Sequence, residues 1–215
     1  MILKFIKNRD FILFTIIFII LVAVGISNPN FVTLKSISDV LTDTSILIIL
    51  ALSQMIVILI RAIDLSVASN LALSGMLISL LSQIYPDLPL IFFILLSCGI
   101  GTLLGLFNGL VIAVLKVPFI VTTLGTLSIY RGLIYFVSDG KQVYSHEFSD
   151  SFLSFIHVKF LSLTSLVWFA VCVFIIIYIL LNYTKFGRNI YALGGNPEAA
   201  KYIGINENRY IIAAY

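Results

Sequence analysis

Long stretches without a single charged side chain constrain this 215-residue chain more than any other feature. The uncharged runs cover 11–34, 44–60, 65–86, 88–115, 117–130 and 160–184, and the fifth run continues to 138 if Arg131 is allowed inside it. A helix needs about 20 apolar residues to cross the roughly 30 Å hydrocarbon layer of a membrane. We therefore predict six membrane-spanning segments, at 11–27, 42–60, 65–84, 90–115, 118–138 and 161–182, and the start of a further one near Tyr215.

The composition excludes several classes of protein. Hydrophobic residues make up 60% of the chain and charged residues 11%, whereas soluble domains carry about 25% charged residues. The net charge of +3 is too small for a nucleic-acid-binding protein. Apolar residues do not alternate with polar ones along 175–181, as they would in a barrel strand, and an isolated apolar run satisfies its backbone in lipid only as a helix. We expect an all-α, polytopic transmembrane helix bundle whose surroundings are the lipid bilayer.

Lysine and arginine residues in the predicted loops indicate the orientation of the bundle. Nine of them fall on one side (Lys4, Lys7, Arg9, Arg61, Lys116, Lys185, Arg188, Lys201 and Arg209) and three on the other (Lys35, Lys141 and Lys159). Because cytoplasmic loops carry the excess of positive charge, the N-terminus is predicted to be cytoplasmic. The first segment has the outline of a signal peptide, but its uncharged run is longer than a signal core, which favours an uncleaved span.

Small residues recur every fourth position in the predicted span 90–115. They are Ser97, Gly101, Gly105 and Gly109. Since residues four apart lie on one helix face, this stripe predicts close packing against another helix and indicates nothing about a substrate.

The stretch 185–205, on the predicted cytoplasmic side, contains the start and stop signals of a short helix. Gly194 and Gly195 are expected to break the chain, after which Asn196 is an N-cap, Pro197 suits the first turn, and Glu198 suits the positive helix end. The signals that continue and end the helix are Ala199, Ala200, Lys201 and Gly204. A helix of about two turns is not stable alone in water, so we expect it to dock against another structure.

Four ordered motifs resemble one transporter family. They are Phe186-Gly187-Arg188 with Gly194 to Ala200, Ile63-Asp64-Leu65-Ser66-Val67, Gly105-Leu106-Phe107-Asn108-Gly109-Leu110, and Pro118 to Thr126 continuing to Tyr130-Arg131-Gly132. The stretch from Glu198 to Gly204 is similar to the coupling loop of permease subunits in ATP-binding-cassette (ABC) importers. The whole set resembles the branched-chain amino acid and simple-sugar permease superfamily, on the ribose, xylose, rhamnose and autoinducer-two side, from about residue 40 onward.

The resemblance implies the subunits of a larger transporter. These are a cytoplasmic ATP-hydrolysing subunit that holds the coupling helix, a second permease subunit (the same or a different chain), and an extracytoplasmic sugar-binding protein. The sequence contains no G-x-x-x-x-G-K-[ST] loop, so this chain is not expected to bind the phosphates of ATP in that way. It also lacks paired carboxylates, metal-ligand spacing and a nucleophile with its base, so it is expected to be neither an enzyme nor a holder of a cofactor or metal. Members of the family usually have about ten spans, so 1–215 is expected to be one permease domain that lacks its C-terminal part, with 183–206 as its coupling loop.

A sugar path needs uncharged hydrogen-bonding groups inside the bundle. Candidates by polarity and position are Gln54, Asp64, Asn70, Asn108, Thr122, Ser128 and Arg131, and hydrogen bonding between helices is the alternative role. Arg61 and Asp64 can pair locally and Asp64 can cap the next helix, in either a tight hairpin or a break that lines a path. Arg131 either reaches the outer interface or faces a wet cavity. The alternative function is an ion-coupled secondary transporter, which needs ionisable groups within its spans.

Overall fold

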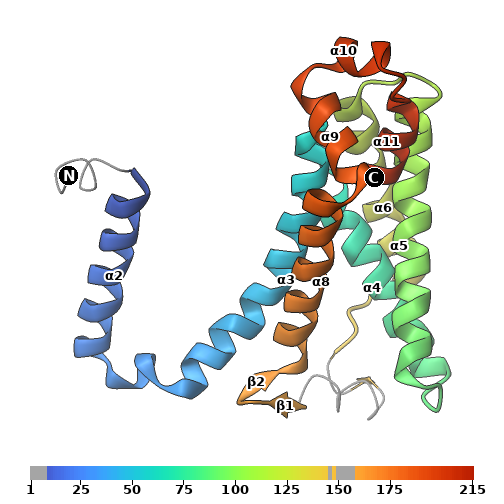
Figure 1. Cartoon of the computed structure of the whole chain (residues 1–215). Helices are drawn as coiled ribbons and strands as arrows, with labels where there is room; N and C mark the ends of the chain where they lie inside the picture. Colours follow the sequence, from blue (N-terminus) through green and yellow to red (C-terminus); the bar gives the residue numbers. More distant parts are fainter. Residues whose placement is uncertain (1–8, 145–146, 149–157) are drawn as a thin grey trace, which may run out of the picture.

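The structure, a computed structural model, describes residues 9–144, 147–148 and 158–215 and is almost entirely helical (Figure 1). Its elements are α2 (Arg9–Ser27), the short 3-10 helix η1 (Pro29–Val32), α3 (Leu34–Leu59), α4 (Val67–Ile84), α5 (Leu90–Ala113), α6 (Phe119–Ser138), β1 (Lys159–Phe160), β2 (Leu163–Thr164), α8 (Ser165–Tyr183), α9 (Lys185–Gly195), α10 (Pro197–Tyr202) and α11 (Glu207–Ala214). Lys4 and Lys7, which contribute to the predicted orientation, lie outside the described residues.

Five of the described helices are long and apolar enough to cross a membrane, namely α3, α4, α5, α6 and α8. The predicted all-α polytopic bundle is therefore confirmed. The first predicted span corresponds to α2, whose apolar part, Phe11–Ser27, is shorter. Figure 1 shows α2 standing apart from the bundle, joined to it through η1 and the start of α3. Apolar side chains cover the helices on the outside as well, as expected where lipid replaces water.

Two predicted spans begin several residues away from the observed helix starts. The second helix begins at Leu34 rather than at 42, because the Thr33 hydroxyl accepts a hydrogen bond from the Ser36 N–H at 3.2 Å and so caps it earlier. The last predicted span begins later than 161, because 159–164 form a two-stranded antiparallel hairpin. Its two turn residues, Leu161 and Ser162, both have positive φ, as a two-residue hairpin turn requires.

The bundle is built around α4 and α5. α4 packs against both α5 and α6, α3 packs against α8, and α11 lies along α5. The glycine stripe of α5 lies at two of these contacts: Gly101 is next to Asn70 of α4, while Gly105 and Gly109 lie against the backbone of Tyr215 and Ile212. A Cβ at Gly105 or Gly109 would collide with that backbone, so α11 approaches α5 where these glycines leave room.

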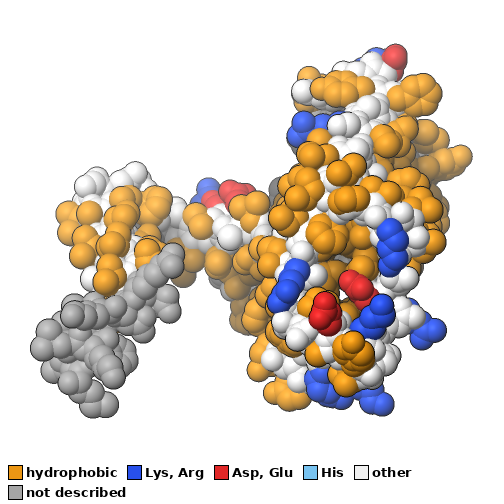
Figure 2. All heavy atoms as spheres, turned by 90° about the horizontal axis from the view of Figure 1, so that it is seen from above, with side chains coloured by type: hydrophobic (Ala, Val, Ile, Leu, Met, Phe, Trp, Pro, Cys, Tyr) orange, Lys and Arg blue, Asp and Glu red, His pale blue; other side chains and the backbone are white. Residues whose placement is uncertain are grey.

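The loops fall at two opposite ends of the bundle, grouped as the alternation of spans predicts. The end that carries α9, α10 and α11 also holds the turns at Arg61 and Lys116, and Figure 2, which views this end, shows lysine and arginine side chains gathered over it. Lys35, Lys141 and Lys159 belong to the other end, with the β1–β2 hairpin. We call these the α10 end and the hairpin end.

Candidate functional site

At the α10 end, α9 follows α8 and packs against α8 and α3 with one face buried. The Thr184 hydroxyl caps its start by accepting from the Gly187 N–H at 3.3 Å. Gly187, Ile190 and Leu193 recur every third residue and are all buried. The expected chain break falls directly after Gly194 and Gly195, because α9 includes both glycines, ends at Gly195 and is separated from α10 by the extended residue Asn196. Gly194 permits a close approach, since a Cβ there would overlap the carbonyl oxygen of Leu59 in α3.

The predicted short capped helix is present as α10. The Asn196 side chain accepts a hydrogen bond from the Ala199 N–H at 3.0 Å, and Pro197 occupies the first helical position. Glu198 lies in the first turn and Lys201 in the last, where each complements the helix dipole. The helix ends before Gly204, whose φ of 83° is the left-handed conformation that glycine adopts without strain.

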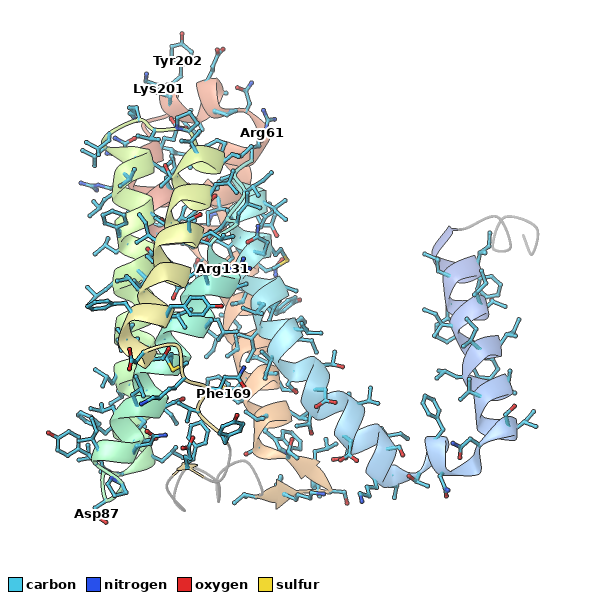
Figure 3. All side chains as sticks on the ribbon, turned by 180° about the vertical axis from the view of Figure 1, so that it is seen from behind. Arg61, Asp87, Arg131, Phe169, Lys201 and Tyr202 are labelled. Atoms are coloured by element: carbon cyan, nitrogen blue, oxygen red, sulfur yellow. The ribbon has the colours of Figure 1, made fainter. Side chains whose placement is uncertain are left out.

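One face of α10 packs inward and the other is fully open. Ala200 is 2% exposed and holds the helix to the protein, whereas Tyr202 is 92% and Ile203 is 74% exposed. Figure 3 shows Lys201 and Tyr202 pointing away from the bundle, beyond the ends of the membrane helices. The sequence analysis missed Tyr202 and Ile203. The signal that could have found them is the presence of large apolar side chains in a helix predicted to face water.

Arg61 does not pair with Asp64, so that prediction is wrong for the described structure. Its Nε donates to the carbonyl of Gly194 at 2.6 Å and its Nη2 to the carbonyl of Gly195 at 2.8 Å. The guanidinium thus binds the last carbonyls of α9, where the helix dipole is negative. This contact joins residues more than 130 positions apart in the sequence.

Asp64 belongs instead to a polar cluster beside the α3–α4 turn, which consists of Gln54, Asp64, Ser66 and Asn108. Its Oδ1 accepts from both the N–H (2.8 Å) and the hydroxyl (2.6 Å) of Ser66, so it orders the turn residue that precedes α4 and does not cap α4 directly. The Gln54 side-chain amide lies 3.2 and 3.3 Å from the Asp64 backbone N–H and carbonyl, and it pairs with both when its oxygen faces the N–H. Asn108 of α5 donates to the Ser66 hydroxyl at 2.7 Å. Sequence reasoning missed Ser66, which joins the other members.

Asn108 is completely buried, and its Oδ1 has no hydrogen-bond partner among the described residues. An unsatisfied buried oxygen is costly unless another molecule bonds to it. Three of the candidate path residues are thus linked near the α10 end: Gln54 lies against the Asp64 backbone, and Asn108 is joined to Asp64 through Ser66.

The other candidate path residues lie elsewhere. Asn70 donates to the carbonyl of Gly101 at 3.2 Å, a hydrogen bond between α4 and α5. Thr122 is buried, and its hydroxyl has no partner among the residues described. Ser128 and Arg131 are exposed on the outer side of α6, and Figure 3 shows Arg131 well inside the length of the bundle. Neither side chain bonds to another helix in the described structure.

The first small residue of the α5 stripe faces a pocket. Ser97, at the start of the stripe, is half-buried and lines an apolar pocket together with Gly75 and Phe93. The part of the chain that the structure describes contains no group of three His, Cys, Asp or Glu residues able to hold a metal ion.

Long apolar helices, a polar cluster at one end and a short capped helix exposed beyond that end define a multi-pass membrane protein. The family described as "Branched-chain amino acid transport system / permease component" matches residues 36–215. The chain belongs to this family.

Its relatives are named as import permease proteins for galactose and methyl galactoside, for ribose or for autoinducer 2. The chain is 33% identical to a galactose/methyl galactoside import permease protein of Haemophilus influenzae, over 97% of this chain and 68% of that protein. It is 36% identical to a ribose import permease protein of the same organism, over 95% and 62%. It is 35% identical to an autoinducer 2 import system permease protein of Klebsiella pneumoniae, over 97% and 60%. The chain thus spans about two thirds of the length of these relatives. No solved structure is significantly similar to it.

Proposed function

We propose that this chain is the membrane-spanning permease subunit of an ABC importer that carries a simple sugar or a sugar-like molecule into the cell. Family membership and the names of the relatives support this function. The observation that carries it is the open face of α10. Tyr202 and Ile203 are 92% and 74% exposed and lie beyond the ends of the membrane helices, where an exposed apolar patch is typical of a protein contact.

The proposed occupant of this face is the ATP-hydrolysing subunit. Tyr202 and Ile203 form a compact apolar knob, and the same short helix carries a carboxylate (Glu198) and an ammonium group (Lys201). This combination fits a groove with a hydrophobic floor and a polar rim. The gathering of lysines and arginines at this end supports a cytoplasmic position for α10, and with it a cytoplasmic N-terminus in the cell membrane. ATP binding in the partner would then move α9 and α10, and with them the attached ends of the membrane helices.

The translocation path is proposed to involve the cluster of Gln54, Asp64 and Asn108 together with the face of α6 that points away from the other helices. Uncharged hydroxyl-rich molecules need groups that donate and accept hydrogen bonds, and the free Oδ1 of Asn108 offers one acceptor. Ser128 and Arg131 are exposed on α6, and an arginine facing hydrocarbon at this depth is costly. This cost favours a wet cavity or a second permease subunit beside α6. An extracytoplasmic binding protein would deliver the sugar at the hairpin end.

The experiment reconstitutes the complete permease with its ATP-hydrolysing and sugar-binding subunits in liposomes and measures uptake of labelled galactose and ribose. We expect uptake to require ATP and to persist when ion gradients are removed. Replacing the knob, Tyr202→Ala with Ile203→Ala, should lower uptake and co-purification of the ATP-hydrolysing subunit by about tenfold or more, because central apolar contacts dominate interface energies. The matched control is Tyr178→Ala, an exposed tyrosine within the membrane helix α8, which should change neither. Uptake that follows an ion gradient in the absence of ATP would contradict the proposal and favour a secondary transporter.

A further inference from the structure

The α3–α4 turn has the backbone of a helix ending that usually requires glycine, yet it carries an arginine. The Ala62 N–H donates to the Val57 carbonyl at 3.1 Å and the Arg61 N–H to the Ile58 carbonyl at 2.9 Å. This pair of hydrogen bonds is the Schellman pattern, in which the residue at the Arg61 position is left-handed. Arg61 has a φ of 61°, a conformation that is unfavourable for a residue with a Cβ. A role for the side chain would explain an arginine at this position.

The Arg61 side chain has a definite target, the end of α9. Its Nε and Nη2 bind two successive carbonyls, those of Gly194 and Gly195, at 2.6 and 2.8 Å. Two donors on one planar group fix the direction of the contact as well as its strength. The backbones also touch, because Gly194 leaves no room for a Cβ against Leu59. We call this combination of two hydrogen bonds and one backbone contact the Arg61 clamp.

The Arg61 clamp lies between two parts of the protein that must move together if the chain is a permease. On one side, α9 leads directly through Asn196 into α10. On the other side, the turn continues to Ile63, whose carbonyl accepts from the Tyr215 hydroxyl at 3.0 Å, and to Asp64, which holds Ser66 and through it Asn108. An unbroken series of short contacts therefore runs from the exposed helix to the buried polar cluster.

We propose that Arg61 is a positioning residue that couples movement of α10 to the polar cluster between α3, α4 and α5. This inference rests on the proposed importer function for its role in transport, whereas the clamp itself can be tested without it. With the clamp in place, displacement of α9 carries the α3–α4 turn along. Without it, the partner subunit can still bind α10 and hydrolyse ATP, but the displacement no longer reaches the cluster.

The test compares Arg61→Gly with Lys116→Gly in the reconstituted complex, measuring sugar imported and ATP hydrolysed in the same vesicles. Both residues are left-handed, at φ 61° and 57°, and both lie in turns at the α10 end, so glycine relieves the same strain in each. Only Arg61 binds α9; Lys116 donates to Asn208 of α11. We expect Arg61→Gly to assemble and hydrolyse ATP while the sugar imported per ATP falls at least tenfold, and Lys116→Gly to stay within twofold of the unmodified protein.

Two further variants strengthen the comparison. Arg61→Asn keeps a residue that tolerates the left-handed turn but is too short to reach α9, so it replaces Arg61→Gly if the glycine variant does not assemble. Arg61→Lys retains one charged donor and should recover part of the coupling. A ratio of sugar to ATP unchanged in both Arg61→Gly and Arg61→Asn overturns the proposal. An equal loss in Arg61→Gly and Lys116→Gly also overturns it, because the effect would then follow from the turn backbone.

Hydrogen exchange of the permease alone tests the clamp independently of transport. The amides at the end of α9, including the Asn196 N–H that donates to Ala192, should exchange at least fivefold faster in Arg61→Gly than in Lys116→Gly. If the unmodified complex shows no ATP-dependent uptake, the importer function fails while this measurement still decides the clamp. Unchanged exchange in Arg61→Gly shows that the guanidinium does not hold α9.

Discussion

Gly109 and Gly99 occupy the same helix, α5, but have different surroundings. A Cβ added at Gly109 would lie 2.9 Å from the Cα of Ile212 in α11, whereas nothing lies within 4 Å of one added at Gly99. The spacing of the small residues predicted a packed stripe that includes Gly109 and leaves Gly99 out. The identity of the helix that packs there could not be predicted, since α11 follows almost a hundred residues later.

This difference predicts opposite effects of the same substitution. Gly109→Ala should destabilise the protein by about 1–3 kcal/mol, because the added methyl forces α5 and α11 apart. Gly99→Ala should be neutral or stabilising by up to about 1 kcal/mol, because alanine is the better helix former and has space there. Thermal unfolding in detergent measures both. Equal unfolding temperatures for the two variants would show that α11 does not pack at Gly109.

At the scale of elements, α10 is a helix of 6 residues whose end signals are all visible in the sequence. Asn196, Pro197 and Gly204 predict its start and end because caps act on the nearest amides and carbonyls. The contacts of α10 with the rest of the protein, through buried Ala200 and through α9, depend on tertiary packing. The expected break follows Gly195, and both glycines belong to α9. Local propensity disfavours glycine in a helix, but packing against α3 selects it at Gly194.

The cap on α10 can be tested by one substitution. Asn196→Ala removes the acceptor for the Ala199 N–H and should cost about 1 kcal/mol of local stability, so the amides of α10 should exchange about fivefold faster. Hydrogen exchange read by mass spectrometry on peptides covering 196–204 measures this change. Asn196→Ser is the control, since serine restores the cap and should restore the slow exchange. Equal exchange in Asn196→Ala and the unmodified protein would mean that packing alone holds the helix.

At the scale of the whole molecule, the opposite ends of the bundle differ in charge and in the elements they carry. The α10 end has α9, α10 and α11 with most of the lysines and arginines, and the hairpin end has β1, β2 and the α4–α5 turn at Asp87 (Figures 2 and 3). Positive charge on short loops keeps those loops in the cytoplasm during insertion. The proposed orientation therefore places Lys201 inside the cell and Asp87 outside.

Labelling of single cysteines tests this orientation. Cys98 and Cys172 are first replaced by alanine, and Asp87→Cys or Lys201→Cys is then introduced at an exposed position. A membrane-impermeant maleimide should label Asp87→Cys in intact cells and Lys201→Cys only after the membrane is opened. The reverse pattern would place α10 outside and remove the basis for an ATP-hydrolysing partner there.

The sequence by itself determined the membrane class and the capped helix at 197–202. It also determined the positions of the long helices to within a few residues, except at the start of α3 and of α8. These features depend only on the length of apolar runs and on neighbouring residues. The tertiary structure alone decided that Arg61 binds α9, that Ser66 joins Asp64 to Asn108, and that Tyr202 stands free of the bundle. The physical reason is distance along the chain. A side chain long and charged enough to bond far from its own helix has many possible partners, and only the packed arrangement of helices selects one.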